Sequence, residues 1–439
     1  MGATPKERAV RMGMLSGLGI LLLLLLLSMC DAGEAAEDAK AKKPLKVPGP
    51  ATKLTVPDNY ATDRGWEAAD ASPEYALAQS SGLVGYLERV GQFQYRLRAV
   101  EAKTGKTVWA GEPWRPLTAP GSFPRLLSVT KGDSQYFVAW SYGSTTAEGL
   151  NSTGSFVSLD IYDTADGGRQ RVEVPWTDAP IITGTGPGIL IADGKAKSAV
   201  VDPDTGEVTS VAPAQLGYPA GCANCRTLTE VIGVTDKGLL VSGAREFWVR
   251  GGWYSKTLAP RTADATSGLP TAVTSKHVLA RWHYAPKTPK AATHEIWAVH
   301  ALDTGKIVVQ AECRRPTIAP SEYPQAAVSP DGRYLVAGAL AFDLQEKKGY
   351  CMEETDGTNR LTLVSVSNEG IVYGAVGARS ARDALAGAGA PLTVDMYTGE
   401  PELLESNMRL PQAETLGIGI FRWTDAKNRR HLIAYRIDE

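Results

Sequence analysis

The sequence has no excess of charge of either sign. Its 46 Lys and Arg residues are balanced by 48 Asp and Glu residues, so the formal net charge is −2 at pH 7. A protein that binds nucleic acid through the phosphates needs a strongly basic face, and this balance argues against that class. We therefore expect no nucleic-acid partner.

Long helical patterns and catalytic motifs are also scarce. Gly and Pro number 45 and 27, which favours turns over helices. The segment closest to a helical pattern, residues 375–388, is interrupted by glycines. The chain contains no nucleophile elbow, phosphate-binding loop or zinc-protease motif. We therefore expect an all-β protein, assign it no reaction and expect no cofactor.

The one long apolar run lies at the N-terminus. Residues 12–29 carry no charge and follow Lys6, Arg8 and Arg11. Basic residues followed by an apolar run are typical of an export signal. Because the basic residues stay on the cytoplasmic side, we expect the rest of the chain on the extracytoplasmic face of the membrane.

The apolar run ends in Leu27-Ser28-Met29-Cys30, which resembles the lipobox of bacterial lipoproteins. The resemblance implies that Cys30 is lipidated and tethers the mature protein to the membrane, although Met29 stands where the family usually has a small residue. Two alternatives remain open. Eighteen uncharged residues span ~27 Å as a helix, enough for an uncleaved membrane anchor, and full secretion is the third.

Composition divides the chain into three segments. Residues 1–30 are the signal peptide or membrane anchor. Residues 31–53 combine acidic and basic residues with prolines and contain no aromatic residue. Such a segment buries too little apolar surface to offset its ordering entropy, so we expect a disordered tether. Residues 54–439 are the expected globular domain.

Four of the five cysteines follow Cys30, an even number that favours disulfides outside the cytoplasm. Cys222 and Cys225 pair without any long-range coincidence, which leaves Cys313 with Cys351. A Cys-x-x-Cys pair also occurs in redox centres and zinc sites, and these remain alternatives. The redox interpretation lacks a βαβ context, and no histidine lies within fifty residues to complete a zinc site.

From about residue 70 the chain repeats short apolar strands joined by tight turns. The clearest turns contain Gly105, Gly167, Gly206, Gly305 and Gly399. Glycine there permits the positive φ that such turns require. Their spacing fits a partly degenerate repeat of about 40–50 residues, the period of four-stranded propeller blades. We predict a β-propeller of seven or eight four-stranded blades.

The two ends of the domain are expected to meet. Residues 416–423 and 431–437 form a final hairpin pattern, and an early strand around Leu54 could pair with it. That pairing would close the ring and remove an exposed sheet edge.

Two short motifs carry a family resemblance. Residues 99–109, Ala-Val-Glu-Ala-Lys-Thr-Gly-Lys-Thr-Val-Trp, resemble the quinoprotein-type (PQQ-like) propeller repeat, and residues 329–332, Ser-Pro-Asp-Gly, resemble WD40-like and TolB-like repeats. Both resemblances imply propeller blades. Trp109 occupies the docking-tryptophan position of the first repeat, and the other turns have no tryptophan there.

Quinoprotein enzymes hold their quinone against two adjacent cysteines, beside a calcium ion bound by acidic residues. This chain has no adjacent cysteines and no acidic cluster with calcium-loop spacing. We therefore interpret it as a non-catalytic, membrane-tethered module of the bacterial cell envelope that binds a ligand or an unknown envelope protein. The alternative is a channel-centred enzyme, or a small-molecule or metal binder, of the quinoprotein-like type.

Histidine supplies one candidate metal site. His277 and His283 lie six residues apart on one predicted strand, and His294 and His300 lie six apart on the next. Even spacing places each pair on one sheet face. A hairpin centred on residues 284–293 would place His283 opposite His294 and His277 opposite His300, close enough to share a metal. The alternative is an ordinary polar blade face.

Aromatic residues supply a candidate binding surface. Trp248, Arg250, Trp253 and Tyr254 lie close together in one mid-chain segment. Exposed rings beside an arginine stack on sugars or anchor partner proteins. The alternative is that these large rings fill the spaces between blades.

Overall fold

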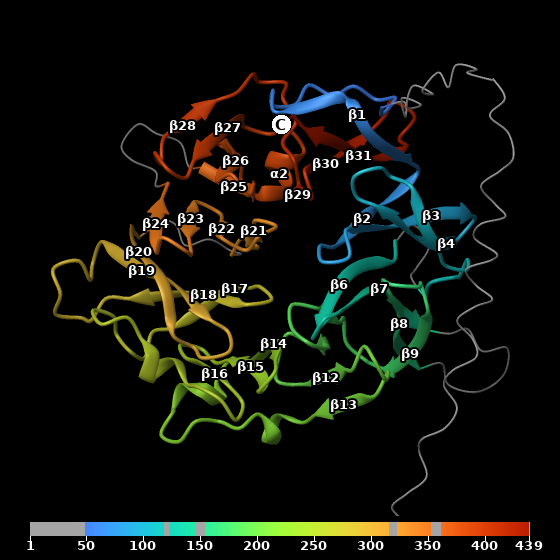
Figure 1. The fold of residues 1–439 in the computed structure, drawn as a ribbon. Coiled ribbons are helices and arrows are strands. Elements are labelled where there is room, and N and C mark those ends of the chain that lie inside the picture. Colours follow the sequence, from blue (N-terminus) through green and yellow to red (C-terminus); the bar gives the residue numbers. More distant parts are fainter. Residues whose placement is uncertain (1–48, 118–122, 145–153, 316–322, 353–360, 439) are drawn as a thin grey trace, which may run out of the picture. The chain divides into compact units, whose positions relative to one another are not determined.

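The computed structural model describes residues 49–117, 123–144, 154–315, 323–352 and 361–438. Within these ranges the chain forms eight antiparallel sheets arranged as the blades of a β-propeller ring (Figure 1). Seven sheets have four strands and one has three. The all-β propeller is therefore confirmed, with eight blades rather than seven.

The blades follow one another along the chain, and each runs from an inner strand to an outer one (Figure 1). Blades 1 to 3 contain β2 (Ala71–Ala78), β3 (Leu83–Gly91), β4 (Gln94–Glu101) and β5 (Thr107–Ala110); β6 (Arg125–Lys131), β7 (Ser134–Ser144), β8 (Ser155–Asp163) and β9 (Arg169–Pro175); and β10 (Ile181–Thr183), β11 (Ile189–Ala192), β12 (Ser198–Val201) and β13 (Val208–Val211).

Blades 4 to 6 contain β14 (Glu230–Thr235), β15 (Gly238–Ser242) and β16 (Phe247–Val249); β17 (Leu269–Val273), β18 (His277–His283), β19 (His294–Ala301) and β20 (Ile307–Arg314); and β21 (Ala327–Val328), β22 (Tyr334–Ala337), β23 (Leu340–Asp343) and β24 (Lys348–Cys351). Blade 4 lacks a regular outer strand, but Tyr254 forms a single bridge with Trp248 in that place.

Blades 7 and 8 contain β25 (Leu361–Val366), β26 (Ile371–Val376), β27 (Ala390–Asp395) and β28 (Pro401–Leu403); and β29 (Ala413–Thr415), β30 (Ile418–Thr424), β31 (Arg430–Ile437) and β1 (Tyr60–Ala69). Residues 375–388, the nearest approach to a helical pattern, include one short helix, α2 (Ala381–Leu385).

The ring closes because β1 pairs with β31, so the N-terminal strand is the outer strand of blade 8. The predicted partnership with the final hairpin is correct, but the strand begins at Tyr60 instead of around Leu54. A turn bonded from Tyr60 to Pro57 separates the two positions. Leu54 still contacts the hairpin, because its N–H donates to the hydroxyl of Tyr435 at 3.0 Å.

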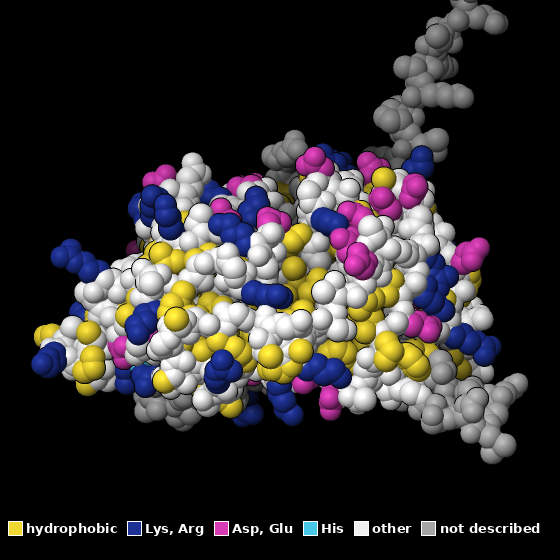
Figure 2. All heavy atoms as spheres, turned by 90° about the horizontal axis from the view of Figure 1, so that it is seen from below, with side chains coloured by type: hydrophobic (Ala, Val, Ile, Leu, Met, Phe, Trp, Pro, Cys, Tyr) yellow, Lys and Arg dark blue, Asp and Glu magenta, His cyan; other side chains and the backbone are white. Residues whose placement is uncertain are grey.

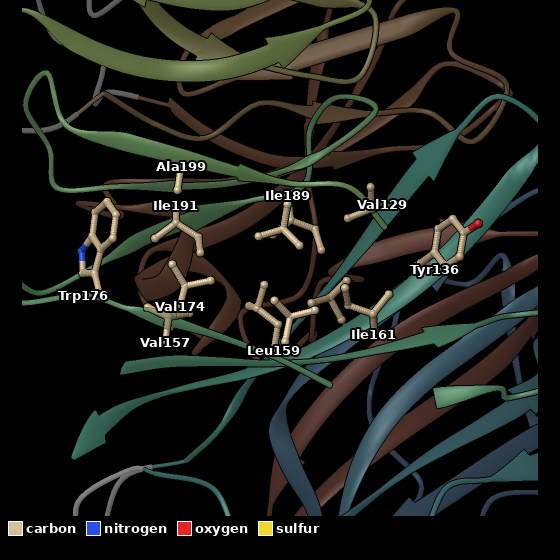
Figure 3. Packing of buried hydrophobic residues seen from close by; sticks show 13 residues of the cluster. Val129, Tyr136, Val157, Leu159, Ile161, Val174, Trp176, Ile189, Ile191 and Ala199 are labelled. Atoms are coloured by element: carbon tan, nitrogen blue, oxygen red, sulfur yellow. The ribbon is translucent and has the colours of Figure 1, made fainter. Parts of the chain in front are cut away.

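The hydrophobic core lies between the blades. At the interface of blades 2 and 3, Val157, Leu159 and Ile161 of β8 pack with Ile189 and Ile191 of β11 (Figure 3). All four residues of β11 are buried, because neighbouring blades cover both faces of each sheet. This arrangement explains why many strands read as continuous apolar runs and not as alternating ones. Each fully buried side chain of this kind contributes about 1.5–3 kcal/mol.

The five glycines used to identify the repeat all have positive φ, as expected for these turns: Gly105, Gly167, Gly206, Gly305 and Gly399. Three of these turns hold a tryptophan from the outer part of the preceding blade. Trp66, Trp109 and Trp253 donate their indole N–H to the carbonyls of Ala102, Thr164 and Leu302, at 2.7, 3.0 and 2.9 Å. Each indole ring lies where a Cβ on the turn glycine would be.

The docking tryptophan is therefore a repeated device in this ring and not a property of Trp109 alone. Trp66 joins blade 8 to blade 1, Trp109 joins blade 1 to blade 2, and Trp253 joins blade 4 to blade 5. A rigid ring follows, because each docked ring bonds to the backbone of the next blade.

The two faces of the ring carry connections of different length. One face, which we call the short-turn face, carries the turns that join the first strand of a blade to the second and the third strand to the fourth. The longest of these turns is residues 202–207. On the opposite face, the long-loop face, connections include residues 212–229, 255–268, 284–293 and 377–389. Binding residues are concentrated on loops that a rigid scaffold positions, so we expect a binding site on the long-loop face.

Seen from below the view of Figure 1, Lys and Arg side chains are interspersed with Asp and Glu, and hydrophobic side chains lie in a band between them (Figure 2). This side of the ring has no field of one sign, in agreement with the near-neutral net charge. None of the helices in the described part of the chain is both long enough and apolar enough to span a bilayer.

Candidate functional site

The long-loop face of blades 4 and 5 brings together four basic side chains: Arg245, Arg281, His283 and Arg315. We call these residues the basic cluster. They come from different elements: Arg245 from the β15–β16 connection, Arg281 and His283 from β18, and Arg315 from the connection directly after β20. Arg281 and His283 are two residues apart on a strand, so they share a face.

The charges of the three arginines all act on the imidazole of His283. Burial, and then the positive charges of Arg281, Arg315 and Arg245, hold the pKa of His283 below its usual value. Asp264 acts in the opposite direction on this histidine, and its backbone N–H donates to the carbonyl of His283 at 2.8 Å. These influences favour the neutral imidazole, and the arginines supply the positive charge of the cluster.

The three arginines differ in their burial and in the contacts of their guanidinium groups. Arg281 is largely buried, lies 3.8 Å from the carboxylate of Glu295 and stands over the ring of Tyr323 at 5.4 Å. Arg245 keeps 52% of its side chain exposed and reaches Asp264 only at 3.8 Å. Arg315 is exposed and donates to the carbonyl of Ala291 at 3.0 Å. Arg245 and Arg315 are thus exposed to solvent, whereas Arg281 is held by Glu295 and Tyr323. Guanidinium groups are well suited to bind a carboxylate or phosphate.

The histidine register differs from the predicted one by a single residue. His277 lies opposite Ala301, His300 opposite Val278, and His283 opposite Glu295. Because a one-residue shift moves side chains to the other face, His277 and His283 share the face toward blade 6, whereas His294 and His300 share the face toward blade 4. The predicted facing pairs are wrong, and the four histidines do not converge on one point.

His300 belongs to the core. It is fully buried, packs against Phe247 and Trp282 at ring distances of 5.8 Å, and its Nδ1 bonds to the carbonyl of Gly305 at 2.8 Å. Burial lowers the pKa of His300 to about 4. His294 lies at the exposed end of β19, where its Nδ1 contacts the hydroxyl of Thr293 at 2.8 Å.

The aromatic segment lines interfaces between blades. Trp248 is 1% exposed, contacts Tyr218 at a ring distance of 5.6 Å and donates to the carbonyl of Leu216. Trp253 is the docking residue described above, and Tyr254 is half-buried. Of the four residues singled out for a binding surface, only Arg250 is exposed.

Both predicted disulfides are present. Cys222 pairs with Cys225, with Cα atoms 5.5 Å apart, and Cys313 pairs with Cys351, with Cα atoms 5.8 Å apart. The second bridge joins β20 of blade 5 to β24 of blade 6. Among the residues that the structure describes, Cys222, Cys225 and Glu246 are the one group of three potential metal ligands that meet. Cys30, the candidate lipidation site, lies outside the described residues.

Several of these groups have no signal in the sequence. Three of them lie in connections between strands, where no strand periodicity identifies them: Arg245, Arg315 and Glu246. Only the packing of the folded chain brings them near the other residues of the site. Arg281 is the exception, because it lies two residues before His283 on a predicted strand.

The short-turn face offers a weaker alternative. A hollow of about 540 Å³ lies between blades 1 and 2, lined in part by Glu101, Lys106, Val108 and Thr164. Its lining contains one acidic and one basic side chain, Glu101 and Lys106. The basic cluster is the better candidate.

Comparisons with known proteins identify no family. No family model matches the chain, and no curated protein matches it. Among solved structures, it is similar to the computationally designed Ika8 protein, with 12% identity and a TM-score of 0.42 over 88% of this chain and 99% of that one. It is also similar to Sqt1 from Saccharomyces cerevisiae, with 9% identity and a TM-score of 0.40 over 88% of this chain and 100% of that one. Likeness at this level carries no information about function.

Proposed function

We propose that this chain is a binding module of the bacterial cell envelope: a β-propeller, tethered to the extracytoplasmic face of the membrane, whose long-loop face recognises an anionic group on a ligand or partner protein. The observation that carries the proposal is the basic cluster, in which Arg245 and Arg315 stay exposed beside the fixed Arg281. The role is non-catalytic: the ring holds the guanidinium groups in place for recognition.

Tethering rests on the N-terminal pattern. The lipobox-like sequence before Cys30 and the charged, proline-containing residues 31–53 support a lipid anchor with a flexible reach. The docked tryptophans support a relation to the PQQ-like repeat at the level of blade construction.

The tether is tested by growing cells with radiolabelled palmitate. The wild-type protein should carry label and sediment with membranes, and Cys30→Ser should lose the label. An unlabelled wild-type protein that still sediments with membranes would favour the anchor helix over the lipid.

Charge reversal tests the binding face. The double variant Arg245→Glu and Arg315→Glu should lose at least about 90% of the partner-bound species in gently solubilised envelopes, because close like charges at an interface cost several kcal/mol. Density-gradient sedimentation measures that species. The matched control reverses Lys106 and Lys237, which are exposed on the short-turn face, and should sediment as the wild type does. Equal loss in both double variants would contradict a specific role for the basic cluster.

A further inference from the structure

The connections on the long-loop face of blades 3 to 5 carry an excess of exposed positive charge. Between β9 and β20 their exposed cations are Lys195, Lys197, Arg226, Arg245, Lys256, Arg261, Lys287 and Lys290, whereas Asp178 is the one exposed acid. The short-turn connections of the same blades are balanced, with Lys237, Arg250, Lys276 and Lys306 against Asp204, Glu207, Asp236 and Asp303. Exposed acids at the adjoining strand ends, Glu230 and Glu312, are too few to cancel the excess. The positive charge therefore belongs to one face of these blades.

Contacts between neighbouring connections join part of this charge into one surface. The carbonyl of Lys195 accepts the N–H of Val231 at 3.3 Å, so the connection between β11 and β12 lies against the start of β14. A Cβ on Gly243 would lie only 2.9 Å from the Cα of Cys225. The connection that carries Arg245 is therefore packed against the backbone directly before Arg226.

The same surface continues into blade 5. The charges of Arg245 and Arg315 both act on His283 of β18. A continuous set of cations thus crosses from blade 3 to blade 5. We call the following five residues the basic patch: Lys195, Lys197, Arg226, Arg245 and Arg315.

Neighbouring groups hold several cations of the patch in place. Nζ of Lys197 lies 4.4 Å from the ring centroid of Trp176, and the guanidinium of Arg226 lies 4.4 Å from the ring centroid of Tyr218. Fixed cations favour a partner whose anions are also fixed relative to one another, because little conformational freedom is then lost on binding. The headgroups of a fluid bilayer move independently of one another. The arrangement therefore favours a protein over a membrane surface.

Two exposed apolar side chains lie beside the patch. Leu228 follows Arg226 by two residues and is 77% exposed, with a φ of 50° that leucine rarely adopts. Ile181, at the start of β10, is 54% exposed, and its Cδ1 would lie 3.4 Å from a Cβ on Gly194, next to Lys195. Apolar contacts among charged ones are typical of protein interfaces.

We propose that the long-loop face of blades 3 to 5 binds an acidic segment of a partner protein, whose carboxylates lie on the basic patch and whose apolar side chains contact Leu228 and Ile181. This inference rests on the proposed function, because Arg245 and Arg315 belong to both the basic cluster and the basic patch. Guanidinium groups bind carboxylates through two parallel hydrogen bonds. The positive patch also repels basic partners, so the charge selects the partner as well as attracting it.

The experiment identifies what touches Leu228 in the cell. Leu228 of the full-length chain is replaced with photoreactive benzoylphenylalanine, intact cells are irradiated, and mass spectrometry identifies the crosslinked residue. We expect an adduct with a protein segment of net negative charge. The matched control places the same group at Leu403, which is 68% exposed on β28 of blade 7, and should not crosslink to that segment. A lipid adduct would assign the surface to a membrane, and a neutral or basic segment, or no adduct, would also overturn the proposal.

Charge reversal outside the basic cluster separates this proposal from the proposed function. Lys197→Glu with Arg226→Glu should lower the yield of the Leu228 adduct at least about tenfold, because close like charges at an interface cost several kcal/mol. The matched control, Lys237→Glu with Lys276→Glu, lies on the short-turn face and should leave the yield unchanged.

The outcome is read together with the Arg245 and Arg315 double variant. If that variant loses the partner-bound species while Lys197→Glu with Arg226→Glu keeps the full adduct yield, the basic cluster binds the partner and the extended patch is wrong. If neither double variant has an effect, the proposed function fails as well.

Discussion

Glu414 makes the stability of this ring depend on pH in an unusual direction. It lies on β29, the inner strand of blade 8, is 5% exposed, and accepts a hydrogen bond from the hydroxyl of Tyr60 at the start of β1. Burial raises its pKa from the usual 4.5 to about 7; the hydrogen bond from Tyr60 opposes this, and the nearby charge of Glu369 adds to it. The group therefore titrates at the place where the ring closes.

The sign and size follow from linkage. Between pH 4.5 and about 7 the folded chain holds a proton on Glu414 that the unfolded chain has lost, so the free energy of unfolding falls as pH rises. Each pH unit corresponds to about 1.4 kcal/mol. The contribution of Glu414 is thus fully present below pH 4.5, and about 3 kcal/mol of it is gone above pH 7. The side chain is too deeply buried for solvent to screen this effect appreciably.

Urea unfolding of the wild type and of Glu414→Gln, from about pH 4.5 to about pH 8, measures this directly. The amide keeps an acceptor for Tyr60 but does not ionise, so the variant should gain about 3 kcal/mol relative to the wild type across the interval. Glu369→Gln, at an exposed neighbour, is the control: it should keep the pH dependence but move its upper end to lower pH. Parallel curves for the wild type and Glu414→Gln would refute the reasoning.

Two further predictions concern the blade interfaces. Gly167→Ala should lower the free energy of unfolding by more than about 2 kcal/mol, because φ is 75° and the new Cβ would lie 2.7 Å from the ring of Trp109; Gly132→Ala, with φ 58° and nothing within 4 Å, should lose only about 1 kcal/mol in the same urea titration. Burial lowers the pKa of His300 to about 4, so the contribution of its neutral imidazole to the free energy of unfolding is fully present above pH 6.5 and is lost as pH falls toward 4. His300→Gln should lose less free energy of unfolding between pH 7 and pH 4.5 than the wild type does. Urea unfolding that shows the same loss in both proteins would contradict this role of His300.

The repeated parts of the fold were the predictable ones. The turn glycines are recognisable in the sequence because a positive φ favours glycine, and all five have a positive φ. The short Cys222–Cys225 bridge follows from spacing, and the other bridge follows by elimination. The propeller architecture is thus predictable from local features of the sequence, namely its turns and the lengths of its strands.

Relations between blades were harder to predict. All three tryptophans dock on the next blade, but only Trp109 follows a Thr-Gly turn of its own blade, so the repeat motif finds it and misses Trp66 and Trp253. The histidine register failed for a similar reason: a ten-residue connection, 284–293, does not determine the alignment of the two strands to within one residue.

The candidate site was the least predictable part. Arg245, Arg315 and Glu246 lie in loops, where residue type is not constrained by strand periodicity. Only the packing of blade 4 against blade 5 brings Arg245 close enough for its charge to act on His283. A site assembled from loops of different blades leaves no spacing pattern in the sequence.

The central claim is that the long-loop face around the basic cluster is the binding face. The most direct measurement places a photoreactive amino acid at Arg245 or Arg315, and in separate strains at Lys106 or Lys237, and irradiates intact cells. We expect a discrete crosslinked partner from the first two positions and none from the two on the short-turn face. Crosslinks from Lys106 or Lys237 to the same partner, with none from Arg245 or Arg315, would show that the protein binds through its other face.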